Sequence, residues 1–174
     1  ASLAKSLLDF TKQTPRSKII FDINPVIEDV LTMIGYTMKN ENIEIIMNML
    51  PSEIDIYGDS NRLTQVFLNL MQNAREAMPN GGVIYISTNY FQDNSVLIQF
   101  RDTGRGISKD QLNKVFCPSY TTKADSKGSG LGMSVCKTII EEFGGTIDLD
   151  SNVGEGTVVS LKLPKCSADQ DGHY

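Results

Sequence analysis

The chain has 174 residues, of which 40% are hydrophobic, and a formal net charge of −5 at pH 7. This length and apolar content predict one compact domain with a hydrophobic core, whereas the acidic balance argues against nucleic acid, whose binding depends on neutralising phosphates. The basic residues are scattered rather than clustered, and no apolar run could span a bilayer, so we expect no membrane-surface role and no direct membrane insertion by this fragment.

The first dozen residues have the leucine and phenylalanine spacing of an amphipathic helix, which the segment 14–17 ends. We interpret residues 1–20 as the end of a helix of a larger protein, followed by a linker. Residues 21–164 carry the regular patterns of a folded domain. Residues 165–174 are expected to form a polar tail, which contains His173, the only histidine.

Helices are predicted from capping residues and apolar periodicity. Asn24 before Pro25 is an N-cap signal, and Asp59 is a second one. Ser108 with Gln111 three residues later forms a capping box. The predicted helices span residues 24–39, 60–78, 108–115 and 131–143.

Strands are predicted where isoleucine, valine and aromatic residues are enriched between turn signals. The predicted strands span residues 43–50, 54–57, 83–91, 96–101, 146–150 and 157–163. The turns at 93–94 and 152–156 join the last four strands into hairpins. The predicted fold class is therefore α+β, a two-layer sandwich in which helices cover one face of a mixed, mostly antiparallel sheet.

One face of the helix predicted over residues 60–78 carries side-chain amides. Asn69 and Asn73 are four residues apart and share this face with Glu76, beside the apolar core face. The amides could be solvated or bonded locally. Alternatively, the amide oxygen of Asn73 could bind Mg²⁺, which prefers oxygen ligands.

A carboxylate precedes a glycine turn at the end of the strand predicted over residues 96–101. Asp102 is followed by Gly104 and Gly106, which allow the backbone to turn and a flat base to approach. The carboxylate could accept a hydrogen bond from the amino group of adenine, whereas guanine presents a carbonyl. An ordinary Asx turn after a strand is the alternative.

A glycine loop leads into the last predicted helix. Backbone N–H groups of such a loop and of the helix start bind anions, although a flexible hinge is the alternative. The preceding segment, residues 116–128, has no periodicity, which favours a lid. Lys123 of this segment is a candidate phosphate contact. The loop residues are Gly128, Ser129, Gly130, Leu131 and Gly132.

Taken together and in this order, these segments resemble the catalytic ATP-binding domain of sensor histidine kinases, in the superfamily shared with gyrase, Hsp90 and MutL. The resemblance covers about residues 22–164 and implies the Bergerat fold of that superfamily. Residues 69–77 resemble its N box, 102–107 its G1 box, 116–123 its F box and 128–135 its G2 box.

The resemblance implies ATP and Mg²⁺ as cofactors, with Mg²⁺ on Asn73, adenine on Asp102, and Thr157 beside that aspartate. Many relatives have a basic residue at the position of Glu76, where a carboxylate cannot contact phosphate. The ATP-binding residues that it implies are Asn69, Asn73, Asp102, Gly104, Gly106, Ile107, Lys123, Gly128, Ser129, Gly130, Leu131, Gly132 and Thr157.

The implied activity is transfer of the γ-phosphoryl group of Mg–ATP to a histidine on an upstream dimerisation helix, and residues 1–20 resemble the end of that helix. The implied partners are these upstream helices and the receiver domain of a response regulator. ATPase relatives have a water-activating glutamate at the position of Asn69, so we expect slow hydrolysis here. A serine-directed anti-sigma-factor kinase and a non-catalytic nucleotide-sensing module remain alternatives.

Cysteine usage bears on the compartment. Cys117, Cys136 and Cys166 are odd in number and far apart, which favours free thiols in a reducing compartment over a disulfide or zinc site. Since no signal peptide is present either, we expect a cytoplasmic fragment, with any membrane tether in other parts of the full-length protein.

Overall fold

The computed structural model describes residues 18–91, 94–117 and 131–166. The helices are α2 (Ile23–Asn40), α3 (Ser60–Ala77), α4 (Lys109–Leu112) and α5 (Gly132–Glu142). The strands are β1 (Ile19–Asp22), β2 (Ile43–Asn48), β3 (Asp55–Gly58), β4 (Gly82–Phe91), β5 (Ser95–Asp102), β6 (Thr146–Asn152) and β7 (Gly156–Pro164).

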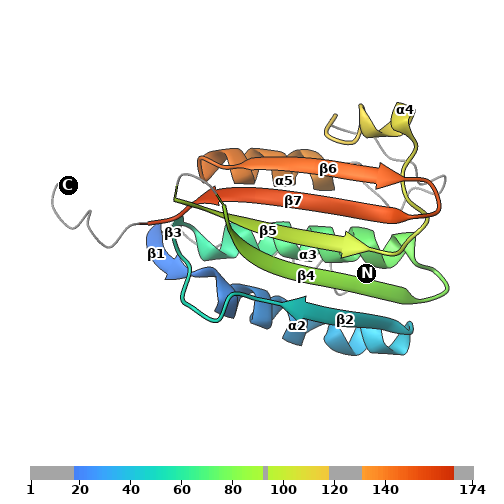
Figure 1. The fold of residues 1–174 in the computed structure, drawn as a ribbon, viewed down its shortest axis with the longest axis horizontal. Helices are drawn as coiled ribbons and strands as arrows, with labels where there is room; N and C mark the ends of the chain where they lie inside the picture. Colours follow the sequence, from blue (N-terminus) through green and yellow to red (C-terminus); the bar gives the residue numbers. More distant parts are fainter. Residues whose placement is uncertain (1–17, 92–93, 118–130, 167–174) are drawn as a thin grey trace, which may run out of the picture.

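The main sheet has the strand order β2-β4-β5-β7-β6. Strands β2 and β4 are parallel, and the other neighbouring pairs in this sheet are antiparallel. Helices α2, α3 and α5 lie on the same side of the sheet (Figure 1). The predicted α+β two-layer sandwich with a mixed, mostly antiparallel sheet is therefore confirmed. None of the helices in the described ranges is long and apolar enough to cross a membrane.

Alternate residues of the central strands point towards the helices and form the core. Ile98 and Phe100 of β5 are buried, as are their cross-strand partners on β7, Leu161 and Val159. The ring of Phe67 on α3 packs against that of Phe100, with centroids 5.4 Å apart. Removal of this apolar surface from water is the main force that fixes α3 on the sheet.

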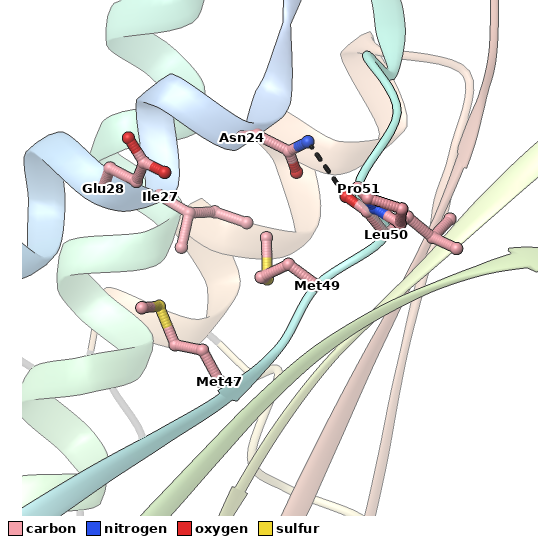
Figure 2. Close-up of a pocket in the computed structure, with 7 residues that line it drawn as sticks. All are labelled: Asn24, Ile27, Glu28, Met47, Met49, Leu50 and Pro51. Carbon is pink, nitrogen blue, oxygen red and sulfur yellow. Dashed lines mark hydrogen bonds between the residues drawn. The ribbon is translucent and has the colours of Figure 1, made fainter.

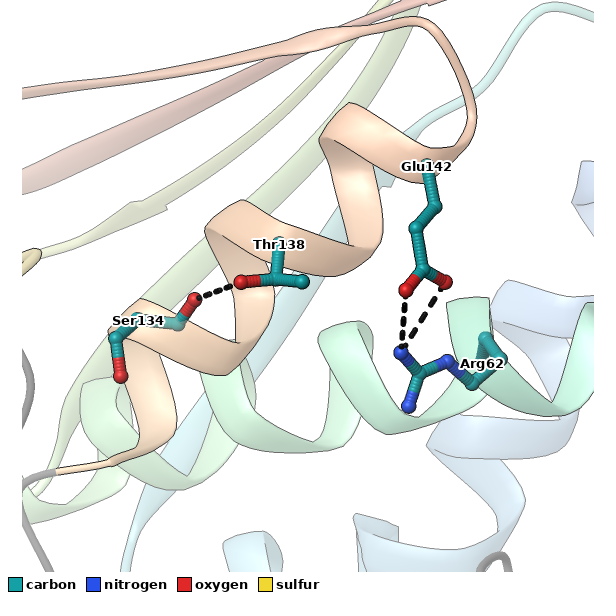
Figure 3. A network of polar contacts seen from close by, with 4 residues as sticks. All are labelled: Arg62, Ser134, Thr138 and Glu142. Carbon is teal, nitrogen blue, oxygen red and sulfur yellow. Dashed lines mark hydrogen bonds and ion pairs between the residues drawn. The ribbon is translucent and has the colours of Figure 1, made fainter.

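Helices α3 and α5 lie side by side over the sheet. Arg62 of α3 places Nη2 3.2 Å from both carboxylate oxygens of Glu142 on α5 (Figure 3). Within α5, the Thr138 hydroxyl donates to the carbonyl oxygen of Ser134. The ion pair is partly exposed and contributes about 0–1 kcal/mol, so the apolar contact around buried Cys136 dominates the packing.

The start of α2 differs from the prediction. The N-cap is Asp22, whose Oδ1 accepts from the backbone N–H of Asn24 and also, at 2.9 Å, from that of Ile54. The Asn24 side chain instead donates to the carbonyl oxygens of Leu50 and Ser52. The prediction that Asn24 caps this helix is wrong, because a tertiary contact holds the chain at Asp22.

A small second sheet was not predicted. Strand β1 pairs antiparallel with β3, and together they form a two-stranded sheet separate from the main one. The strand predicted over residues 54–57 is therefore present as β3 but lies outside the main sheet. The short helix α4 also ends at Leu112, earlier than the predicted end at residue 115.

Candidate functional site

Three buried polar residues lie in one row across the helix-covered face of the sheet. Thr157 of β7 is the cross-strand partner of both Asp102 on β5 and Ser151 on β6. Each of the three is only 6–8% exposed. Burial of polar groups is unfavourable unless they are hydrogen-bonded, so a buried polar row at the edge of an apolar face marks a candidate site. We call these three residues the polar row.

The carboxylate of Asp102 is held by the backbone around it. Its Oδ1 accepts from the N–H of Gly104 at 2.8 Å. Burial raises the pKa of Asp102 above its ordinary value, and backbone hydrogen bonds from Gly104 and Thr157 offset part of this rise. Because this carboxylate has a fixed orientation and little contact with water, a donor on a ligand would gain a strong hydrogen bond from it.

Ser151 connects β6 to the loop that follows β5. Its Oγ accepts from the N–H of Ile107 at 2.9 Å, donates to the carbonyl oxygen of Gly156 at 2.7 Å, and lies 3.0 Å from Oγ1 of Thr157. No sequence motif pointed to Ser151. The available signal was its inward position, two residues after the half-buried Leu149.

The predicted glycines fit tightly around Asp102. A Cβ on Gly104 would lie 2.7 Å from Cβ of Ala77 at the end of α3 and 2.8 Å from Oδ1 of Asp102. Gly106 has φ +69°, and a Cβ there would overlap the carbonyl oxygen of Asn152. The loop after β5 is therefore packed between the end of α3 and the β6–β7 turn.

Helix α3 links this loop to the start of α5. Its last turn contacts the loop, since the N–H of Arg105 donates to the carbonyl oxygen of Ala77 at 3.0 Å. Two turns earlier, Nδ2 of Asn69 lies 3.5 Å from the carbonyl oxygen of Gly132, the first residue of α5. Half-buried Asn73 lies on α3 between these contacts. The three sequence motifs thus meet along one helix.

The side chain of Asn69 faces α5. Burial raises the pKa of the Cys136 thiol to about 12, against a smaller lowering effect of a hydrogen bond with Asn69. This thiol is therefore neutral at physiological pH and acts as a small apolar residue. One turn along α3, Nε2 of Gln72 donates to Oε1 of Glu76 at 2.8 Å, which holds that carboxylate along the helix.

The glycine loop is only partly within the described residues. Leu131 and Gly132 are described, and Leu131 is 44% exposed at the start of α5. The Ser134 hydroxyl donates back to the carbonyl oxygen of Leu131 at 2.9 Å. The predicted contacts Lys123, Gly128, Ser129 and Gly130 lie outside the described residues, and so does most of the predicted lid.

A pocket of about 260 Å³ lies elsewhere, between α2 and the segment that follows β2 (Figure 2). It contains none of the predicted site residues. Glu28 is the one ionisable group on its wall, so the pocket offers no positive charge to a phosphate. Its walls are formed by Asn24, Ile27, Glu28, Met47, Met49, Leu50 and Pro51. The polar row is the better candidate for a nucleotide, because the described residues that the sequence predicted for the site lie around it and not at this pocket.

The family model for histidine kinase-, DNA gyrase B- and HSP90-like ATPases matches residues 58–167. The chain belongs to this family. The sensor histidine kinase ZraS of Salmonella typhimurium is 34% identical over 169 residues, which are 97% of this chain but 36% of that kinase. The chain thus spans about a third of the length of this curated relative.

Solved structures of histidine kinases also resemble this chain. The catalytic domain of histidine kinase ThkA matches with a TM-score of 0.76 and 31% identity, over 86% of this chain and 98% of that domain. The structure of ThkA in complex with response regulator protein TrrA matches with a TM-score of 0.74 and 28% identity, over 93% of this chain and 46% of that one. The chain is therefore an ATP-binding domain of the histidine kinase type.

Proposed function

We propose that this chain binds Mg–ATP beside the polar row and transfers its γ-phosphoryl group to a histidine on a separate helical segment. The polar row carries the proposal, because it places a buried, oriented carboxylate beside the G1-type loop, which contacts the end of α3, the helix that also contacts the start of α5. Membership of the ATPase family and similarity to sensor histidine kinases support the same activity.

In this proposal Asp102 and Thr157 bind the adenine, and Gly104, Gly106 and Ile107 form the wall beside it. The carboxylate accepts from the exocyclic amino group. Gly104 is required because the loop passes within van der Waals contact of both α3 and the carboxylate.

The phosphates would extend along α3 towards α5. The amide oxygen of Asn73 is a hard ligand suited to Mg²⁺, which takes its remaining ligands from phosphates and water. A magnesium ion held by Asn73 would supply neutralisation of the phosphate charge. Backbone N–H groups at Leu131 and Gly132 would bind phosphate oxygens at the helix start. Lys123, Gly128, Ser129 and Gly130 complete the proposed phosphate contacts.

Asn69 bears on whether water or a protein group accepts the phosphoryl group. An amide cannot act as a general base, so the chain should activate water poorly and retain the phosphoryl group for a protein acceptor. An imidazole is itself a nucleophile, so transfer to histidine needs positioning and charge neutralisation rather than a base on this domain. The contact of Asn69 with Gly132 also holds the phosphate-binding end of α5 against α3.

The proposed partners follow from the same relatives. We propose that residues 1–20 continue from the helices that carry the acceptor histidine, that residues 21–164 form the kinase domain, and that residues 165–174 are a tail. A response regulator receiver domain would then take the phosphoryl group from that histidine. The structure of histidine kinase ThkA in complex with response regulator protein TrrA supports a partner of this kind. The proposed location is the cytoplasm, with any membrane tether in other parts of the full-length protein.

Nucleotide selectivity tests the base-binding half of the proposal. Asp102→Ala removes a charge-assisted hydrogen bond, so ATP affinity should fall about ten- to hundredfold in calorimetry. Wild type should prefer ATP to GTP. Since burial raises the pKa of Asp102, wild-type ATP affinity should also decline as the pH is lowered through that pKa, because the ionised carboxylate accepts best.

Asp150→Ala is the matched control, because Asp150 lies on β6 beside Ser151 but is exposed on the opposite face of the sheet. It should leave ATP affinity and its pH dependence unchanged. Equal affinities of wild type for ATP and GTP would contradict the assignment of Asp102.

A further inference from the structure

The proton arrangement at Ser151 follows from its three partners. A serine hydroxyl has one proton and can accept two hydrogen bonds. The carbonyl oxygen of Gly156, 2.7 Å away, can only accept, so the Ser151 proton points to it. The N–H of Ile107 can only donate to Ser151. One acceptor position of Ser151 therefore remains, and it faces Oγ1 of Thr157 at 3.0 Å.

This arrangement determines which of the two hydroxyls donates in the hydrogen bond between Ser151 and Thr157. Because the single Ser151 proton is already used, the short contact between the two hydroxyls requires Thr157 to donate to Ser151. Thr157 then has no proton left for a ligand, and its oxygen can only accept. All three atoms that Ser151 contacts lie at buried or half-buried positions, so water does not compete freely for these hydrogen bonds.

Asp102, the neighbour of Thr157, is also a hydrogen-bond acceptor. Thr157 and Asp102 are directly paired between antiparallel strands, so their side chains project from the same face next to each other. The carboxylate of Asp102 cannot donate when it is ionised. Both side chains therefore present only acceptors to whatever binds at the row.

We propose that Ser151 is a positioning residue that holds the Thr157 hydroxyl as an acceptor, so that the base site selects a purine with an amino group at position 6. This inference rests on the proposed function of the same site. A purine with a carbonyl at position 6 places an acceptor against two acceptors and is rejected. Asp102 thus supplies one half of the selectivity, and Ser151 controls the other half through Thr157.

The test compares ATP with ITP, which has a carbonyl where ATP has the amino group. Wild type should bind ATP more tightly. In Ser151→Ala, the Thr157 hydroxyl is free to rotate and donate to the ITP carbonyl, so the ratio of the two affinities should fall about three- to tenfold. Ser151→Thr keeps the hydroxyl and should keep the ratio. If Ser151 only supported the fold, the affinities for ATP and for ITP would fall together in Ser151→Ala.

A double variant distinguishes a positioning role of Ser151 from a general loss of structure at the site. Thr157→Val removes the hydroxyl that Ser151 is proposed to orient. In that background, Ser151→Ala should change the ratio of ATP to ITP affinity no further. A change of the same size with and without the Thr157 hydroxyl would overturn the inference, as would an unchanged ratio in Ser151→Ala alone.

Wild type allows a test that depends on no variant. The triphosphate of unsubstituted purine riboside has a hydrogen where ITP has the carbonyl, and its N1 carries no proton, as in ATP and unlike in ITP. It should bind more tightly than ITP, because it keeps the N1 of adenine and a missing hydrogen bond at position 6 is less unfavourable than opposed acceptors. Equal or tighter ITP binding would overturn the inference. If ATP itself did not bind, the proposed function would fail as well, whereas ATP binding with the wrong ratios would reject only the role of Ser151.

Discussion

Asn73→Ala is expected to abolish phosphoryl transfer and to remove most of the dependence of ATP binding on magnesium. The reason is the loss of the proposed amide ligand, which leaves the metal bound only through phosphates and water. Removing even a group that supports a metal ligand lowers metal affinity by about ten- to hundredfold, and a direct ligand should matter at least as much. Calorimetry of ATP with Mg²⁺ and with a chelator measures this effect.

Asn61→Ala is the matched control, because Asn61 is an exposed asparagine in the first turn of the same helix. It should bind ATP with the same magnesium dependence as wild type. If Asn73→Ala retained full transfer activity, the metal would have to be bound elsewhere, and the assignment of α3 as the metal-binding helix would be wrong.

Gly156→Ala is expected to destabilise the domain much more than Gly154→Ala, although Gly154 lies in the β6–β7 turn and Gly156 directly after it at the start of β7. Gly154 has φ +85°, and a Cβ there would point into open space, so its replacement costs about 1–2 kcal/mol for conformation alone. Gly156 has φ +96°, and its Cβ would overlap the carbonyl oxygen of Asp102. Overpacking adds about 1–3 kcal/mol, for a total of about 2–5 kcal/mol.

Urea unfolding of the two variants measures this difference directly. Gly154→Ala serves as the control, since it has the same change in side chain and a similar backbone conformation. Equal losses of unfolding free energy in the two variants would show that the backbone at Asp102 is not closely packed against β7. Since the clash displaces Asp102, Gly156→Ala should also weaken ATP binding even where the domain remains folded.

Local signals in the sequence predicted the features that depend on neighbouring residues. Asp59 caps α3 as predicted, and its Oδ1 accepts from the N–H of Asn61 at 3.0 Å. The core face of α3 was also predicted, because residues such as Leu63 and Phe67 recur at helical spacing and are fully buried. Asp102 was identifiable because Gly104 and Gly106 follow it within the same short segment.

Features that depend on distant contacts were not predictable. Pro25 suggested a cap at Asn24, but Asp22 is chosen because it also binds Ile54, which is 32 residues away. Strand β1 has four residues, too few for a period-two pattern, and exists because β3 pairs with it. Ser151 gains its importance from partners on β7 and on the loop after β5, and no local pattern indicates those contacts.

The role of Asn69 illustrates how the structure adds to a motif. Its spacing from Asn73 predicted only a shared helix face. The structure places its amide against Gly132 and the Cys136 thiol, so it joins α3 to the start of α5. The amide thus has a structural reason to be where it is, in addition to the role in limiting hydrolysis that we propose for it.

Transfer in trans is the measurement on which the proposed kinase activity depends. The chain is mixed with Mg²⁺, ATP labelled at the γ-phosphate, and a separately prepared helical segment that carries the acceptor histidine of the same protein. We predict acid-labile label on the histidine of that segment, and neither label on this chain nor rapid hydrolysis when the segment is omitted. Label on His173, acid-stable label on serine, or rapid ATP turnover by the chain alone would contradict the proposed activity.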